Sequence, residues 1–138
     1  MPNEVKLFFF DFLEVKEKQR IEKIMELIYT AIGLFALAAL IGLYMLSLVL
    51  QKKQVPRGAA ITHGLLAGTA LVLLIIDMVR YGADTVQIVV LFIITALGGI
   101  VLFARDITGK SLPKGLAIFH GLLAVTGFIF LLVYTFWK

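Results

Sequence analysis

Residues 53–69 read KQVPRGAAITHGLLAGT, residues 110–126 read KSLPKGLAIFHGLLAVT, and 11 of these 17 aligned positions are identical. Extended without a gap at the same offset of 57 residues, the alignment pairs residues 29–81 with residues 86–138 and contains 17 identities in 53 positions. An apolar composition alone would scatter matches among Leu, Ala and Ile, yet the shared residues include Lys, Pro, Gly, His and Thr. The sequence therefore predicts an internal repeat.

The composition predicts a membrane protein. Hydrophobic residues make up 61% of the 138 residues, against roughly 45–50% in soluble domains, and the mean hydropathy is +1.01. A soluble chain of this size buries only about two-thirds of its surface, so the apolar excess needs lipid around it. The absence of cysteine excludes a disulfide scaffold.

Four apolar segments are long enough to cross a bilayer. They cover residues 28–50, 58–79, 85–104 and 115–136, and a membrane-spanning helix needs about 20 residues. The connections are short, so consecutive helices should be antiparallel neighbours. We predict an all-α membrane protein, a four-transmembrane-helix bundle made of two tandem helical hairpins, residues 28–81 and 85–138.

Residues 1–27 have a different pattern from the spans. A phenylalanine cluster at positions 8, 9, 10 and 12 is followed by charges at helical spacing, Glu14 with Lys18 and Lys18 with Glu22. We predict an N-terminal amphipathic helix that lies in the membrane interface. The alternative is a partly ordered tail whose phenylalanines dip into lipid. The segment lacks the pattern of a signal peptide.

The repeat places one histidine in each half, His63 and His120. Each half contains two spans, so the halves share one topology and should be related by a pseudo-two-fold axis along the membrane normal. Each histidine follows a basic residue, Arg57 or Lys114, by six positions, which puts it roughly 9 Å inside the headgroup level. An ionisable group at this depth indicates function when it faces the bundle.

Small residues accompany both histidines. Ala60, Gly64 and Gly68 form a small-residue ridge in the second span, and the fourth span repeats it as Ala117 and Gly121. Such ridges permit close helix contact, so the histidines beside them are expected to point inward. We predict that Gly64 and Gly121 leave room for a cofactor. In the first and third spans, glycines 42, 98 and 99 are expected to allow close packing.

Two inward imidazoles suit haem b, because the porphyrin supplies four nitrogens and the iron needs only two axial ligands. A structural zinc ion would need four protein ligands. We predict His63 and His120 as axial ligands of haem iron, with the anionic propionates near Arg57 and Lys114. The arrangement resembles, in outline only, four-helix membrane cytochromes of b type with bis-histidine ligation.

Other interpretations of the histidine pair stay open. The rings could tie the two halves together by hydrogen bonds to a facing carbonyl, to Thr69 or to Thr126. A quinone or an anionic lipid could also bind there. Three functions follow: a haem-carrying electron-transfer or anchor subunit, a non-catalytic accessory subunit of a larger membrane complex, and a small transporter. The transporter ranks lowest because no carboxylate lies at mid-span.

The expected partners are the lipid bilayer and either other membrane subunits or further copies of the chain. The net charge is +4, and the basic residues are expected at the two membrane faces, so we expect no nucleic-acid partner. No catalytic motif is present, which favours a protein that is not an enzyme and leaves that question open. We expect a bacterial or archaeal inner or cell membrane.

Charged residues near the span ends do not decide how the protein is oriented in the membrane. Six basic residues lie near the span ends at each membrane face, so the positive-inside rule decides no orientation.

Asp77 and Arg80 are three residues apart at the end of the second span. They are expected to pair with each other near the interface.

Overall fold

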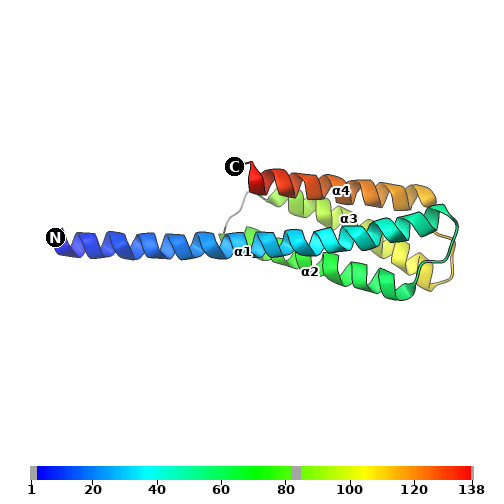
Figure 1. The fold of residues 1–138 in the computed structure, drawn as a ribbon, viewed down its shortest axis with the longest axis horizontal. Helices are drawn as coiled ribbons and strands as arrows, with labels where there is room; N and C mark the ends of the chain where they lie inside the picture. Colours follow the sequence, from blue (N-terminus) through cyan, green and yellow to red (C-terminus); the bar gives the residue numbers. More distant parts are fainter. Residues whose placement is uncertain (1–2, 82–84, 138) are drawn as a thin grey trace.

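The computed structural model describes residues 3–81 and 85–137. Within these ranges the chain forms four helices and no strand: α1 (Asn3–Leu50), α2 (Arg57–Tyr81), α3 (Val86–Ile107) and α4 (Lys114–Phe136). All four are long and apolar enough to cross a membrane, and they pack side by side (Figure 1). The predicted all-α four-span bundle is confirmed. Most of the predicted second loop, residues 82–84, lies outside the described residues.

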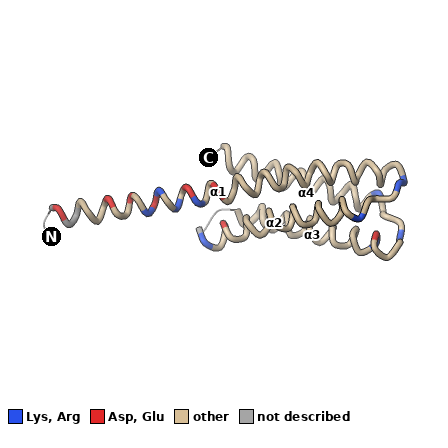
Figure 2. The backbone as a smooth tube through the Cα atoms, turned by 60° about the horizontal axis from the view of Figure 1, so that its bottom comes forward, with Lys and Arg blue, Asp and Glu red and all other residues tan. Residues whose placement is uncertain are grey.

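Helix α1 is much longer than the first predicted span. Its 48 residues extend about 72 Å, more than twice the roughly 30 Å of membrane hydrocarbon. The N-terminal part projects beyond the other helices and carries charges of both signs (Figures 1 and 2). Residues 3–32 contain neither Pro nor Gly, so nothing interrupts the helix between the N-terminal segment and the span. Placement of that segment in the membrane interface stays a prediction.

The four helices form a ring in which the backbone of each lies next to the backbones of two others. Helices α1 and α3 each pack on α2 and on α4, so α1 lies diagonally opposite α3 and α2 lies diagonally opposite α4. Charged residues are absent from positions 27–51, 58–76, 86–104 and 115–137, and they gather near the ends of the bundle and on the N-terminal part of α1 (Figure 2). The bundle therefore has an uncharged middle between two charged ends.

Helices α1 and α3 end in the same way. The backbone N–H of Lys53 donates to the carbonyl of Leu48, and that of Lys110 donates to the carbonyl of Arg105, both at 2.9 Å. The residue before each donor is left-handed, Lys52 at φ 58° and Gly109 at φ 69°. This closure satisfies carbonyls that a helix end leaves without partners. Both hairpins therefore turn by one device, at positions 57 residues apart.

Two apolar clusters fill the interior, one toward each end of the bundle. The larger contains Ile28, Ala31, Phe35, Ala70, Leu74, Ile88, Val89, Phe92 and Leu131, and the smaller contains Val49, Val55 and Ala117. In the larger cluster, Phe35 of α1 and Phe92 of α3 stack across the diagonal, with ring centroids 4.1 Å apart and an interplanar angle of 8°. Gly127 of α4 leaves space for this stack, because a Cβ there would lie 3.2 Å from the Phe92 ring.

The predicted pair of Asp77 with Arg80 is wrong. Asp77 is completely buried, and neither of its carboxylate oxygens has a hydrogen-bond partner among the described residues, whereas Arg80 is exposed. Asp77 continues the buried line of Ala70 and Leu74 at helical spacing. The side of α2 that faces the bundle therefore determines the orientation of Asp77, and Arg80 lies on another side.

Replacing Phe92 with Ala should destabilise the bundle, because the substitution removes the stacking partner of Phe35 and leaves a cavity. Phe-to-Ala substitutions in protein cores cost about 3–5 kcal/mol of unfolding free energy. We expect a clearly lower midpoint of thermal unfolding in detergent, followed by circular dichroism. The matched control is Phe130→Ala on α4, where the side chain is 53% exposed. Equal midpoints for the two variants would contradict the role of the stacked pair.

Candidate functional site

The two histidines make equivalent hydrogen bonds. The Nδ1 of His63 on α2 lies 2.9 Å from the carbonyl oxygen of Ala38 on α1, and the Nδ1 of His120 on α4 lies 2.9 Å from that of Thr95 on α3. A carbonyl oxygen only accepts, so Nδ1 must carry the hydrogen in both rings. Each imidazole therefore ties the two helices of one hairpin together.

The structure brings the two rings together in the middle of the bundle. The centroids of His63 and His120 are 6.2 Å apart, and the ring planes make an angle of 68°. Both side chains are half-buried. Along α1, the contacts of His63 at Ala38 and Gly42 lie between the two apolar clusters. The rings therefore form a polar layer between apolar ones.

Glycines on the facing helices allow the rings to enter. A Cβ at Gly42 would lie 3.0 Å from Cε1 of His63, and a Cβ at Gly99 would lie 3.0 Å from Cε1 of His120. At Gly98 the nearest atom would be Nδ1 of His120, at 3.6 Å. The expected close packing at these glycines is present, but their neighbours are imidazole rings. The identity of Gly42 and Gly99 at the 57-residue offset is the sequence signal for this role.

The predicted ridge on the second span is wrong at two positions. Gly64 and Gly68 are exposed, and a Cβ on either would meet nothing within 4 Å, so neither gives close helix contact. Gly121 is half-buried, and its nearest neighbour is a methyl group of Leu46 at 3.7 Å. Positions 63 and 64 are separated by about 100° around the helix. Because His63 points toward α1, Gly64 is turned away from α1.

The two predicted basic residues stand at the first positions of their helices. Arg57 begins α2 and Lys114 begins α4, and both are exposed. The Nζ of Lys114 donates to the carbonyl of Leu50 at 2.6 Å, so this ammonium group caps the C-terminal end of α1. Their role toward propionates stays a prediction.

The structural interpretation is right about one partner, a facing backbone carbonyl, although each bond lies within one hairpin and does not join the two halves. The threonines of that interpretation do not bind the rings. The hydroxyl of Thr126 donates to the carbonyl of Leu122 in its own helix at 2.9 Å, and both Nδ1 atoms bind backbone carbonyls. Thr95 takes part through its backbone, while its hydroxyl donates to the carbonyl of Leu91 at 2.8 Å. Sequence patterns could not identify these acceptors, because every residue has a carbonyl.

Each ring has one nitrogen atom that makes no hydrogen bond to the described residues. With Nδ1 protonated, Nε2 of each neutral ring carries a lone pair, and no hydrogen bond to either Nε2 is found within residues 3–81 and 85–137. Two imidazoles bound to one metal at about 2 Å would have ring centroids about 6 Å apart, close to the 6.2 Å observed. The same residues contain no group of three or more His, Cys, Asp or Glu side chains placed to hold a metal ion. The spacing of the ring centroids is therefore that of two imidazoles bound to one metal ion.

Space beside the rings is limited. The backbone at Gly42 and Gly99 lies against the imidazole edges. A macrocycle between the rings would therefore require α1 and α3 to move outward.

Comparison with known proteins returned no match to a family model, to a curated protein or to a solved structure.

Replacing Gly42 with Ala should weaken the bond between His63 and Ala38, because the new methyl group would press on the ring. We expect a loss of about 1 kcal/mol in unfolding free energy, the usual contribution of one hydrogen bond, measured by thermal unfolding in detergent. Gly33→Ala is the control, because this glycine of α1 is exposed and a Cβ there meets nothing. A Gly42→Ala variant at least as stable as Gly33→Ala would contradict the contact.

Proposed function

We propose that the protein is a haem b-binding electron-transfer or anchor subunit, with His63 of α2 and His120 of α4 as axial ligands. The observation that carries the proposal is the matched pair of Nδ1–carbonyl hydrogen bonds. These bonds leave both Nε2 atoms available in rings whose centroids are 6.2 Å apart. The proposed location is a bacterial or archaeal cell membrane.

The residues of the chain would act by orienting and tuning the ligands. Donation from Nδ1 to a carbonyl holds each ring in one tautomer and raises the basicity of Nε2. The uncharged middle of the bundle keeps water and ions away from the centre, and Arg57 and Lys114 at one end offer positive charge to propionates. When bound, haem supplies one-electron transfer within the bilayer.

An internal repeat would explain why the site is symmetric. The histidines, the carbonyl acceptors Ala38 and Thr95, and the glycines at 42 and 99 each form a pair 57 residues apart. We infer two tandem hairpins, each of which contributes one imidazole and one glycine contact to a shared centre. This arrangement suits a ligand with two equivalent faces, such as a porphyrin.

Detergent-purified protein from cells supplied with a haem precursor should have a sharp Soret absorption band. His63→Ala and His120→Ala should each abolish the band or shift it to that of a five-coordinate species, since each removes one of two ligands. Thr126→Ala is the matched control, because its hydroxyl binds only its own helix, and its spectrum should be that of wild type.

Two outcomes would overturn the haem proposal. One is protein without a Soret band even after reconstitution with haem. The other is a band that survives replacement of both histidines. In the first case, a large loss of thermal stability in His63→Ala would favour the purely structural pair, and a ligand extracted with solvent would identify a quinone or an anionic lipid.

A second candidate is an accessory subunit of a larger membrane complex, favoured by the part of α1 that lies beyond the bundle. Four phenylalanines there are 48–75% exposed: Phe8, Phe9, Phe10 and Phe12. A helix with large exposed apolar side chains outside its own bundle offers a surface to another protein. The partner would be a second membrane subunit or another copy of this chain.

A photo-crosslinking amino acid at position 9, activated in native membranes, should give a protein adduct if this surface binds a partner. The same amino acid at position 65 is the control, because Leu65 is 66% exposed on α2 within the bundle and should contact lipid. Gel electrophoresis with detection of the chain measures the adducts. If position 9 gives no more adduct than position 65, the second candidate is wrong.

A further inference from the structure

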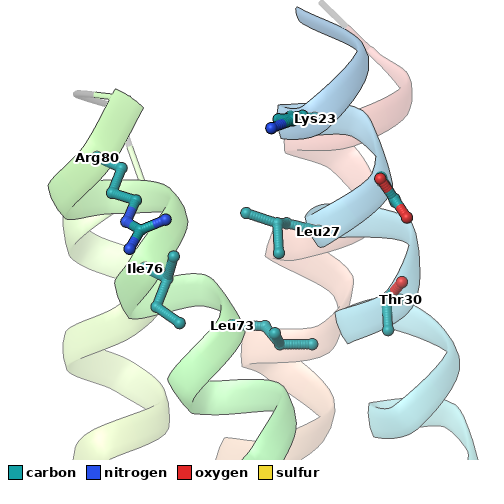
Figure 3. Close-up of a pocket in the computed structure, with 7 residues that line it drawn as sticks. Lys23, Leu27, Thr30, Leu73, Ile76 and Arg80 are labelled. Carbon is teal, nitrogen blue, oxygen red and sulfur yellow. The ribbon is translucent and has the colours of Figure 1, made fainter. Parts of the chain in front are cut away.

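An open groove of about 370 Å³ lies between α1 and α2, at the end where α1 leaves the bundle. Figure 3 shows Lys23 on α1 and Arg80 on α2 on opposite sides of the groove, with Leu27, Ile76 and Leu73 between and below them. The groove therefore has a basic mouth and an apolar floor. It lies at the opposite end of the bundle from Arg57 and Lys114.

The mouth of the groove also contains one acidic residue. Glu26 of α1 lines it together with Lys23 and Arg80, and all three are exposed. Within residues 3–81 and 85–137, none of the three takes part in an ion pair shorter than 4.0 Å. Two positive groups and one negative group are thus available to a ligand that carries the complementary set of charges.

The depth of the groove suits a lipid. The uncharged middle of the bundle begins at Leu27 on α1 and ends at Ile76 on α2. The three charged residues therefore lie at the headgroup level, and the apolar floor extends into the hydrocarbon. A phospholipid has the same order of parts, because its phosphate lies at the interface and its acyl chains lie below. A soluble phosphate would leave the apolar floor uncovered.

We propose that this groove binds a phospholipid with a primary ammonium in its headgroup, of the ethanolamine class. Lys23 and Arg80 would hold the phosphate, Glu26 would accept hydrogen bonds from the ammonium, and an acyl chain would cover Leu73 and Ile76. Arginine and lysine bind phosphate oxygens by charge-assisted hydrogen bonds. The carboxylate of Glu26 disfavours a purely anionic headgroup, and a choline headgroup has no N–H to donate.

The test uses full-length protein, delipidated in detergent and titrated with single phospholipids, with binding followed by native mass spectrometry. Phosphatidylethanolamine should bind more tightly than phosphatidylglycerol or phosphatidylcholine. Lys23→Gln and Arg80→Gln should each weaken its binding about five-fold, the factor expected for one basic residue at a lipid phosphate. Glu26→Gln should remove the preference for ethanolamine over choline. Lys18→Gln, on α1 outside the groove, should bind as wild type does.

Three results would overturn the proposal. Wild-type affinity for phosphatidylethanolamine in both Lys23→Gln and Arg80→Gln would place the lipid elsewhere. Tighter binding of phosphatidylglycerol would contradict the ethanolamine headgroup. Displacement of the lipid by millimolar inorganic phosphate would identify a soluble anion as the ligand. All substituted side chains are exposed, so circular dichroism should give the helix content of wild type in every variant.

Discussion

The two imidazole–carbonyl hydrogen bonds are the interaction on which the arrangement of the bundle depends. Lipid tails are as apolar as leucine, so the hydrophobic effect does not hold helices together inside a membrane, and close packing and hydrogen bonds must do so. His63 ties α2 to α1, and His120 ties α4 to α3. A polar ring in hydrocarbon needs a partner from the protein, and the facing backbone supplies it.

The two hairpins are joined where α1 packs on α4 and α2 packs on α3, and two ring contacts also cross the diagonals of the bundle. The imidazole rings meet between α2 and α4, and the Phe35–Phe92 stack joins α1 to α3 in the larger apolar cluster. Glycine makes both contacts possible, at positions 42 and 99 beside the imidazoles and at position 127 beside Phe92. The centre thus consists of a polar layer and an aromatic layer, each formed by two rings from diagonally opposite helices.

The two ends of the bundle differ in chemistry. At one end, the first residues of α2 and α4 are basic, and Lys114 binds the last carbonyl of α1. At the other end, α1 continues beyond its neighbours, and basic and acidic residues line a groove with an apolar floor. The proposed cofactor and the proposed lipid would therefore occupy separate parts of the molecule, and each can be tested without the other.

The amino-acid sequence by itself determined the four spans, the all-helical class and the two histidines, because hydrocarbon thickness sets segment length and a polar residue stands out in an apolar helix. It could not reveal the carbonyl partners of the rings, since backbone acceptors have no sequence signal. Spacing along one helix also suggested a helix contact at Gly64 and an ion pair of Asp77 with Arg80, and the structure has neither. Only the tertiary structure decided these points, because the side of a helix that is buried depends on where its neighbours lie.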